Sequence, residues 1–243
     1  MAGIPQVISS DSASGAQIID GSLTFERTSD SVNTYLYRNF TNGNSKKWTW
    51  STWIKRGNIS STNRFFGGNN GSTDDNNWFT VLFHPTDGDI RFGAYGSFPR
   101  VSNGAFRDTS GWYHLVVNVD IDNATSSKKY RAYINGQEVT WSSSSDKSNT
   151  GLNRSGFVGY IGAEVSGVGG SANNGFGGSM TQCYFLDGLA LGPGYFGFTD
   201  PLTNAWKPKK FKAEGTTVND GTVWSAGAGA NFESSNPATN GFN

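Results

Sequence analysis

Apolar and small polar residues alternate along many short stretches of this chain. The clearest alternation begins at Trp48, where Thr49 separates Trp48 from Trp50 and Ser51 follows. A period of two places every second side chain on the same face of a β-strand, which leaves one face apolar and the other polar. On this pattern we expect strands at residues 23–27, 35–37, 48–56, 64–66, 78–83, 90–95, 112–120, 130–134, 137–141, 158–163 and 180–191.

Turn signals connect these segments. Residues 130–134 and 137–141 are separated only by Asn135-Gly136. Both central positions of a type I′ turn need a positive φ, which Asn and Gly adopt at the lowest cost, so this pair predicts a β-hairpin. Residues 84–88 contain a proline and an Asp-Gly pair, and they predict a second turn.

The strand pattern predicts an all-β fold. About a dozen short strands with turns between them are typical of a two-sheet antiparallel β-sandwich of the jelly-roll type. No helix-length segment separates the strands, which excludes a parallel α/β fold. Only 35% of the residues are hydrophobic but 14% are aromatic, so we expect a folded core built on Phe, Trp and Tyr.

We expect one domain with an extended arm at each end. Residues 1–20 are small and polar and form the N-terminal arm, residues 21–213 form the sandwich, and residues 214–243 form an extended C-terminal tail. After Gly192 the strand pattern gives way to sparse aromatic anchors. The tail needs a surface to cover it, either on its own domain or on a neighbouring subunit, and the sequence favours neither.

Charge and composition narrow the function classes. The chain has 19 basic and 19 acidic residues, which is unlike the basic surface of a nucleic-acid-binding protein. The one basic run, residues 207–212, is interpreted as a solvated or docking segment. A single cysteine, Cys183, excludes an internal disulfide framework. The N-terminal residues lack the features of a secretory signal, and no apolar stretch approaches the roughly 18 residues that a membrane helix needs.

Several segments, in this order, resemble the concanavalin A-like/laminin-G lectin superfamily. They are a central strand at residues 112–120, a hairpin at 133–139, an Ile-Gly-Ala strand at 161–163 and a glycine-led last strand at 177–191. The resemblance covers about residues 20–192. It implies a two-sheet lectin-type sandwich.

A narrower resemblance is to laminin-G-like modules of structural proteins from marine tailed phages. Residues 25–30, 50–56 and 196–209 carry it, and the last of these ends in Trp206-Lys207-Pro208-Lys209. Asn240-Gly241-Phe242 corresponds to a segment that follows in those modules. This resemblance implies a virion surface protein: a capsid decoration, head-fibre or tail-fibre subunit on the outside of the particle.

The same resemblance implies partners. They are other virion proteins, further copies of the chain in a homo-oligomer, and host-surface glycans. A free carbohydrate-binding lectin is the alternative, and a degenerate glycoside hydrolase is a remote one.

We expect no catalysis. Glucanases on this fold use paired carboxylates on one strand, because the reaction needs two acidic groups flanking one bond. Here the glutamates are scattered singly, and the pattern Glu-x-Asp-x-x-Glu does not occur. His114 lies in an expected central strand, where a hydrogen-bonded core histidine is favoured over a catalytic base. We therefore assign no catalytic residue and no cofactor.

Candidate binding residues are those that place an aromatic ring beside polar groups, as sugar recognition requires. They are Trp78 with the neighbouring Asn76 and Asn77, Phe176 with Asn173 and Asn174, and Trp141 at the end of its strand. Asp74 and Asp75 are the weak candidates for a Ca²⁺ site, because carboxylates suit a hard cation. Asx turns that cap the loop explain these aspartates more simply, so we assign no metal site.

Overall fold

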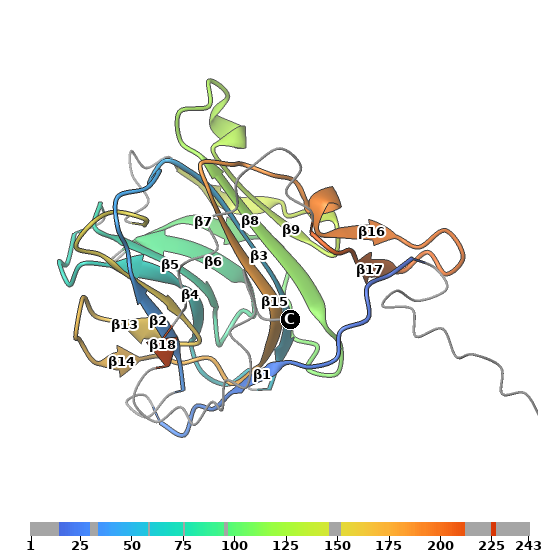
Figure 1. The fold of residues 1–243 in the computed structure, drawn as a ribbon, viewed down its shortest axis with the longest axis horizontal. Helices are drawn as coiled ribbons and strands as arrows, with labels where there is room; N and C mark the ends of the chain where they lie inside the picture. Colours follow the sequence, from blue (N-terminus) through green and yellow to red (C-terminus); the bar gives the residue numbers. More distant parts are fainter. Residues whose placement is uncertain are drawn as a thin grey trace, which may run out of the picture.

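The computed structural model describes residues 15–29, 34–57, 59–74, 76–94, 97–145, 152–211 and 225–226. Two antiparallel sheets pack face to face (Figure 1). The six-stranded sheet has the order β1 (Leu23–Phe25), β15 (Gly178–Asp187), β3 (Lys47–Arg56), β8 (Tyr113–Asp120), β9 (Tyr130–Ile134), β10 (Gln137–Glu138). The eight-stranded sheet has the order β11 (Trp141–Ser144), β7 (Ser97–Ser102), β6 (Ile90–Ala94), β5 (Trp78–Phe83), β4 (Asn63–Asn69), β12 (Val158–Ile161), β2 (Leu36–Asn39), β18 (Ser225–Ala226).

Four short strands and two 3₁₀ turns complete the described chain. β13 (Glu164–Val165) pairs with β14 (Ala172–Asn173), and β16 (Gly197–Thr199) pairs with β17 (Trp206–Pro208). The 3₁₀ turns are η1 (Ser126–Lys128) and η2 (Pro193–Tyr195). The prediction of an all-β antiparallel sandwich is confirmed. None of the helices in the described part of the chain is long and apolar enough to cross a membrane.

The core between the sheets is aromatic, as the composition predicts. Trp48 and Trp50 of β3 are fully buried, and Trp50 stacks on Phe66 with ring centroids 4.3 Å apart and planes 4° apart. A bulge in β4 lies between Arg64 and Phe66. It lets the adjacent Phe65 and Phe66 both enter the core, where strict alternation would admit only one.

The predicted turn at Asn135-Gly136 is confirmed, but the strand after it is shorter than expected. Asn135 and Gly136 have φ values of 49° and 82°, as a type I′ turn requires. β10 ends at Glu138, but the backbone N–H of the buried Val139 still donates to the Ala132 carbonyl of β9 at 2.9 Å, so the chain leaves the six-stranded sheet only after Val139. Trp141 therefore begins β11, which pairs with β7 in the other sheet. The expectation of one strand over 137–141 was wrong, because the chain crosses to the other sheet between Val139 and Trp141.

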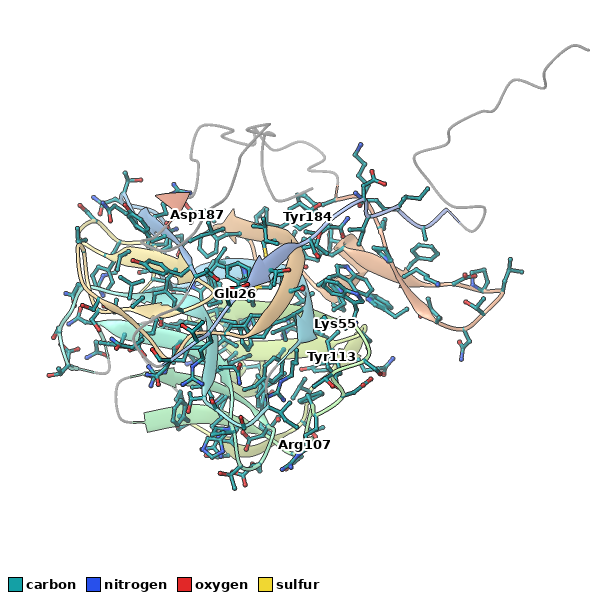
Figure 2. All side chains as sticks on the ribbon, turned by 90° about the horizontal axis from the view of Figure 1, so that it is seen from below. Glu26, Lys55, Arg107, Tyr113, Tyr184 and Asp187 are labelled. Carbon is teal, nitrogen blue, oxygen red and sulfur yellow. The ribbon has the colours of Figure 1, made fainter. Side chains whose placement is uncertain are left out.

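The strand pattern missed several elements, among them the short strands β13, β14 and β18. β7 was not expected, and neither was the β16–β17 hairpin, which lies where we expected only aromatic anchors. This hairpin lies on the side of the six-stranded sheet that faces away from the other sheet (Figure 1). It is attached by a second apolar cluster, in which Phe196 stacks on Tyr184 of β15 with centroids 5.9 Å apart (Figure 2 labels Tyr184).

Part of each predicted arm contacts the same domain. The backbone N–H of Gln17 donates to the Pro208 carbonyl of β17 at 3.0 Å. Ser225 and Ala226 of the predicted tail pair with Tyr37 and Leu36 at the edge of the eight-stranded sheet. The other residues of 214–243, including Asn240-Gly241-Phe242, lie outside the described residues.

The stacked aromatic core predicts a large cost for removing one of its rings. Phe66→Ala should lower the free energy of unfolding by about 3–5 kcal/mol, because it deletes a fully buried ring and leaves a cavity. Urea titration followed by tryptophan fluorescence measures this change. Tyr195→Ala, at a residue that is 53% exposed, is the control and should change stability by less than about 0.5 kcal/mol. Equal effects of the two substitutions would contradict the assignment of the core.

Candidate functional site

The outer face of the six-stranded sheet carries buried polar side chains that hold down the chain after β15. The Thr49 hydroxyl donates to the Leu189 carbonyl at 2.7 Å and accepts from the Leu191 N–H at 2.8 Å. Asn118 donates from Nδ2 to the Leu191 carbonyl at 3.0 Å. The polar members of the alternating strands thus satisfy the backbone of the crossing segment, which then leads into the β16–β17 hairpin.

His114 fastens the hairpin to this face. The Trp206 indole Nε1–H donates to His114 Nδ1 at 2.9 Å, and His114 Nε2 lies 3.0 Å from the Ser51 hydroxyl. An indole nitrogen can only donate, so Nδ1 is the acceptor and the proton is on Nε2, which donates to Ser51. Burial lowers the pKa of His114 to about 3, so the ring is neutral at neutral pH. The prediction of a hydrogen-bonded core histidine is confirmed.

Two glycines hold the Trp206 indole in place. A Cβ on Gly136, in the β9–β10 turn, would lie 2.4 Å from the Trp206 ring, and a Cβ on Gly197 of β16 would lie 2.5 Å from it. Neither position tolerates a side chain while the indole stays where it is. Gly136 thus serves both the positive φ of its turn and the close approach of the hairpin.

This docking creates a groove beside the hairpin. The groove is open to solvent, has a volume of about 470 Å³ and is lined by Trp53, Trp112, Asn135, Gln137, Thr199, Asn204, Ala205 and Trp206. We refer to it as the three-tryptophan groove. Its volume lies in the range of roughly 300–1,000 Å³ that is typical of small-molecule sites.

The three indoles differ in how freely they face the groove. Trp53 is 8% exposed and stacks on His114 with centroids 4.9 Å apart. Trp206 is half-buried between its glycines. Trp112 is 38% exposed, so it offers the most accessible aromatic surface. Indoles beside carboxamides and a hydroxyl suit a ligand with apolar C–H faces and hydroxyl groups.

The structure places the sequence-predicted aromatic residues elsewhere. Phe176 is fully buried and packs against Phe25 and Phe65, and Trp78 is 5% exposed at the start of a central strand. Neither presents a ring face to a sugar, because the sandwich needs both for its packing. Trp141 is half-buried and packs edge-on against Phe92, with centroids 5.1 Å apart. Burial of Trp78 and Phe176 argues against these two candidates, and sugar contact at Trp141 stays a prediction.

The predicted polar partners are engaged in contacts within the protein. Asn77 accepts a hydrogen bond from Arg154 Nη2 at 2.9 Å, and the backbone N–H of Asn76 donates to Asp74 Oδ1 at 2.9 Å. Asn173 donates to the Ser171 carbonyl at 3.4 Å, and Asn174 donates to Glu164 at 3.5 Å. Sugar binding by these amides stays a prediction.

Asp74 forms the loop contacts expected of an Asx turn. Its second carboxylate oxygen accepts from the Ser72 hydroxyl at 2.7 Å, and these hydrogen bonds hold the pKa of Asp74 below its usual value. Asp75 lies outside the described residues. Within the part of the chain that the structure describes, no three His, Cys, Asp or Glu side chains gather as a metal-binding group would require.

The groove has no local signature in the sequence, because its residues come from four separate segments. Trp112 was assigned only to a strand, and Trp206 only to a closing segment. The available signal was the polar residue Ser51 in β3 and the polar residues His114 and Asn118 in β8, which is largely apolar. A buried polar side chain on an outer face needs a partner, which indicates that another segment covers it.

The state of His114 predicts a pH-dependent contribution to stability. The folded pKa of about 3 lies below the ordinary value of 6.5, so the unfolded chain takes up a proton that the folded chain resists. The contribution of this group is complete above pH 6.5 and is lost as the pH falls towards 3, by at most about 1.4 kcal/mol per pH unit. His114→Gln removes this titration. The stability difference between wild type and variant, from urea titrations at several pH values, should shrink from pH 6.5 to pH 3. A constant difference would contradict a buried neutral histidine.

Comparisons with known proteins agree with this architecture. The model of a family described as the concanavalin A-like lectin/glucanases superfamily matches residues 26–189, about two thirds of the chain. No curated protein matches the chain.

Solved structures share the fold at low sequence identity. A "putative carbohydrate binding protein" from Bacteroides ovatus has a TM-score of 0.50 and 18% identity, over 91% of this chain and 57% of that one. The chain thus spans little more than half the length of that protein. A heptameric SAP-like pentraxin from Limulus polyphemus has a TM-score of 0.49 and 16% identity, over 67% and 73%. Domain 4 of the arabinanase AbnA from Geobacillus stearothermophilus, in complex with arabinotriose, has a TM-score of 0.45 and 20% identity, over 74% and 78%.

Proposed function

We propose that this chain, which belongs to the concanavalin A-like lectin/glucanases superfamily, is a non-catalytic carbohydrate-binding module. The observation that carries the proposal is the three-tryptophan groove, in which an exposed indole lies beside carboxamide and hydroxyl groups on a lectin-type sandwich. Aromatic rings bury the C–H faces of sugars, and fixed polar groups orient the hydroxyls. The description of the Bacteroides protein points in the same direction.

The described glutamates support a role without catalysis. Glu164 is buried and forms an ion pair with Arg64, so it is committed to a structural contact. Burial raises the pKa of Glu164, while Arg64 and Asn174 oppose that shift. Glu26 and Glu138 lie in other parts of the chain, beside β1 and on β10. Glycoside hydrolysis needs two carboxyl groups that face one bond. Neither Glu26 nor Glu138 is among the residues that line the groove.

We also propose that this module is displayed on the outer surface of a tailed phage particle. The supporting observation is the resemblance of residues 196–209 to the closing segment of phage laminin-G-like modules. The same segment builds one wall of the groove, so the resemblance includes part of the proposed binding site. In this setting the partners are other virion proteins and further copies of the chain, and the groove faces host glycans. A free lectin accounts equally well for the fold and the groove.

Glycan binding is tested on an array of oligosaccharides with the purified protein. We expect saturable binding to a subset of sugars, and Trp112→Ala should weaken it at least tenfold because the most exposed indole is lost. Tyr195→Ala removes another exposed aromatic ring, which is outside the groove lining, and should leave binding unchanged. Absence of binding to any sugar would contradict the proposal, and equal effects of the two substitutions would mean that the sugar binds outside the groove.

The virion setting is tested by mass spectrometry of purified phage particles. We expect the chain in the particles at a fixed ratio to the major capsid or tail protein. Its presence only in the unassembled fraction would favour the free lectin.

The absence of catalysis is tested by a reducing-sugar assay over the bound glycans. We expect no turnover, and measurable release of sugar would restore the hydrolase alternative.

A further inference from the structure

We propose that the three-tryptophan groove selects neutral oligosaccharides and discriminates against carboxylated and sulfated ones. This inference rests on the proposed function and names the ligand class of the same site. Four of the eight lining residues, Thr199, Asn204, Ala205 and Trp206, lie beyond residues 26–189 that match the family model. The groove is therefore a feature that the C-terminal hairpin adds to the family fold.

The first observation that favours neutral ligands is the lack of charge in the groove lining. None of the eight lining residues that the structure describes has an ionisable side chain. An anionic sugar that entered would lose part of the hydration of its carboxylate without gaining an arginine or lysine partner there. Burying a charge without a partner is costly, whereas a neutral sugar pays no such penalty.

The hydrogen-bonding groups of the lining carry the second step. Asn135, Gln137 and Asn204 have carboxamides, and Thr199 has a hydroxyl, so each of these side chains can both donate and accept. Sugar hydroxyls also do both, whereas a carboxylate or sulfate only accepts. Asn135 is oriented in advance, because its Oδ1 accepts the His114 backbone N–H at 2.8 Å, while its NH₂ group can donate to a ligand and the second lone pair of Oδ1 can accept.

The aromatic walls carry the third step. Trp53 and Trp206 are held by His114 and by the glycines of the turn and hairpin, so they shape the groove. Trp112 is the indole with the largest exposed surface, and it follows that one pyranose ring packs against it. The carboxamides of the β9–β10 turn and the hairpin then contact the hydroxyls of that ring and of its neighbour in the chain.

The test uses matched pairs of oligosaccharides of equal length and linkage, which differ only in having a C6 hydroxymethyl group or a C6 carboxylate. Titration calorimetry on the full chain should give at least tenfold tighter binding of the neutral member. Its affinity should change by less than twofold between 50 and 500 mM NaCl, since no charge pair is screened. Tighter binding of the uronate members would overturn the inference.

A charge-introducing variant gives the reciprocal test. Gln137 is exposed and lines the groove, so Gln137→Lys places a cation there. The variant should gain at least fivefold in affinity for the uronate member, and this gain should disappear in 500 mM NaCl. Ala124→Lys makes the same charge change in an exposed loop at the opposite end of β8, and it should have no effect.

The outcomes separate this inference from the proposed function. If uronates bind best and Trp112→Ala abolishes their binding, the groove is a carbohydrate site and the ligand class is wrong. If neutral sugars bind and Trp112→Ala has no effect, the inference about this groove fails while carbohydrate binding by the module stands. If no member of any pair binds, both proposals fail.

Discussion

The hydrogen bond from the Trp206 indole to His114 Nδ1 positions the β16–β17 hairpin on the outer face of the six-stranded sheet. It joins a central strand of the sandwich to the hairpin that follows it, and it fixes the tautomer of a buried imidazole. Burial of that imidazole keeps it neutral, which is the state in which Nδ1 can accept a hydrogen bond from the indole N–H. The two glycines that admit the Trp206 ring depend on the same placement. Without this bond the hairpin would lose its hydrogen bond to the central strand β8, and the Trp206 wall of the groove would lose the contact that orients it.

The strands that pack in the core were easier to predict from the sequence than the segments that connect and cover the sheets. Period-two alternation predicted β3, because a strand buried on one face places apolar residues at every second position, and short apolar segments between turns predicted β5 and β8. The Asn135-Gly136 turn was predictable from its need for positive φ. The departure of the chain from the six-stranded sheet at Val139 was not, because it depends on which sheet offers the better packing. Such competition is decided by tertiary contacts and leaves little trace in a local pattern.

The site shows the same limit of local reasoning. Polar neighbours in the sequence made Trp78 and Phe176 the candidate aromatic residues for sugar binding. In the folded protein these rings fill the core, since a sandwich with few aliphatic residues must bury most of its large aromatics. The groove instead joins Trp112, the β9–β10 turn and the β16–β17 hairpin, which are far apart in the sequence. Only the polar positions Ser51, His114 and Asn118 indicated that a segment would cover this face.

A shared fold does not assign a ligand, so the account depends on the groove rather than on the superfamily. The most direct measurement is a crystal structure of the full chain soaked with the tightest-binding neutral oligosaccharide. The account predicts a pyranose ring against Trp112, with hydroxyls in contact with Asn135 or Gln137 and with the β16–β17 hairpin. A sugar bound instead at the loop around Asp74, or at any surface that lacks Trp112, would contradict it.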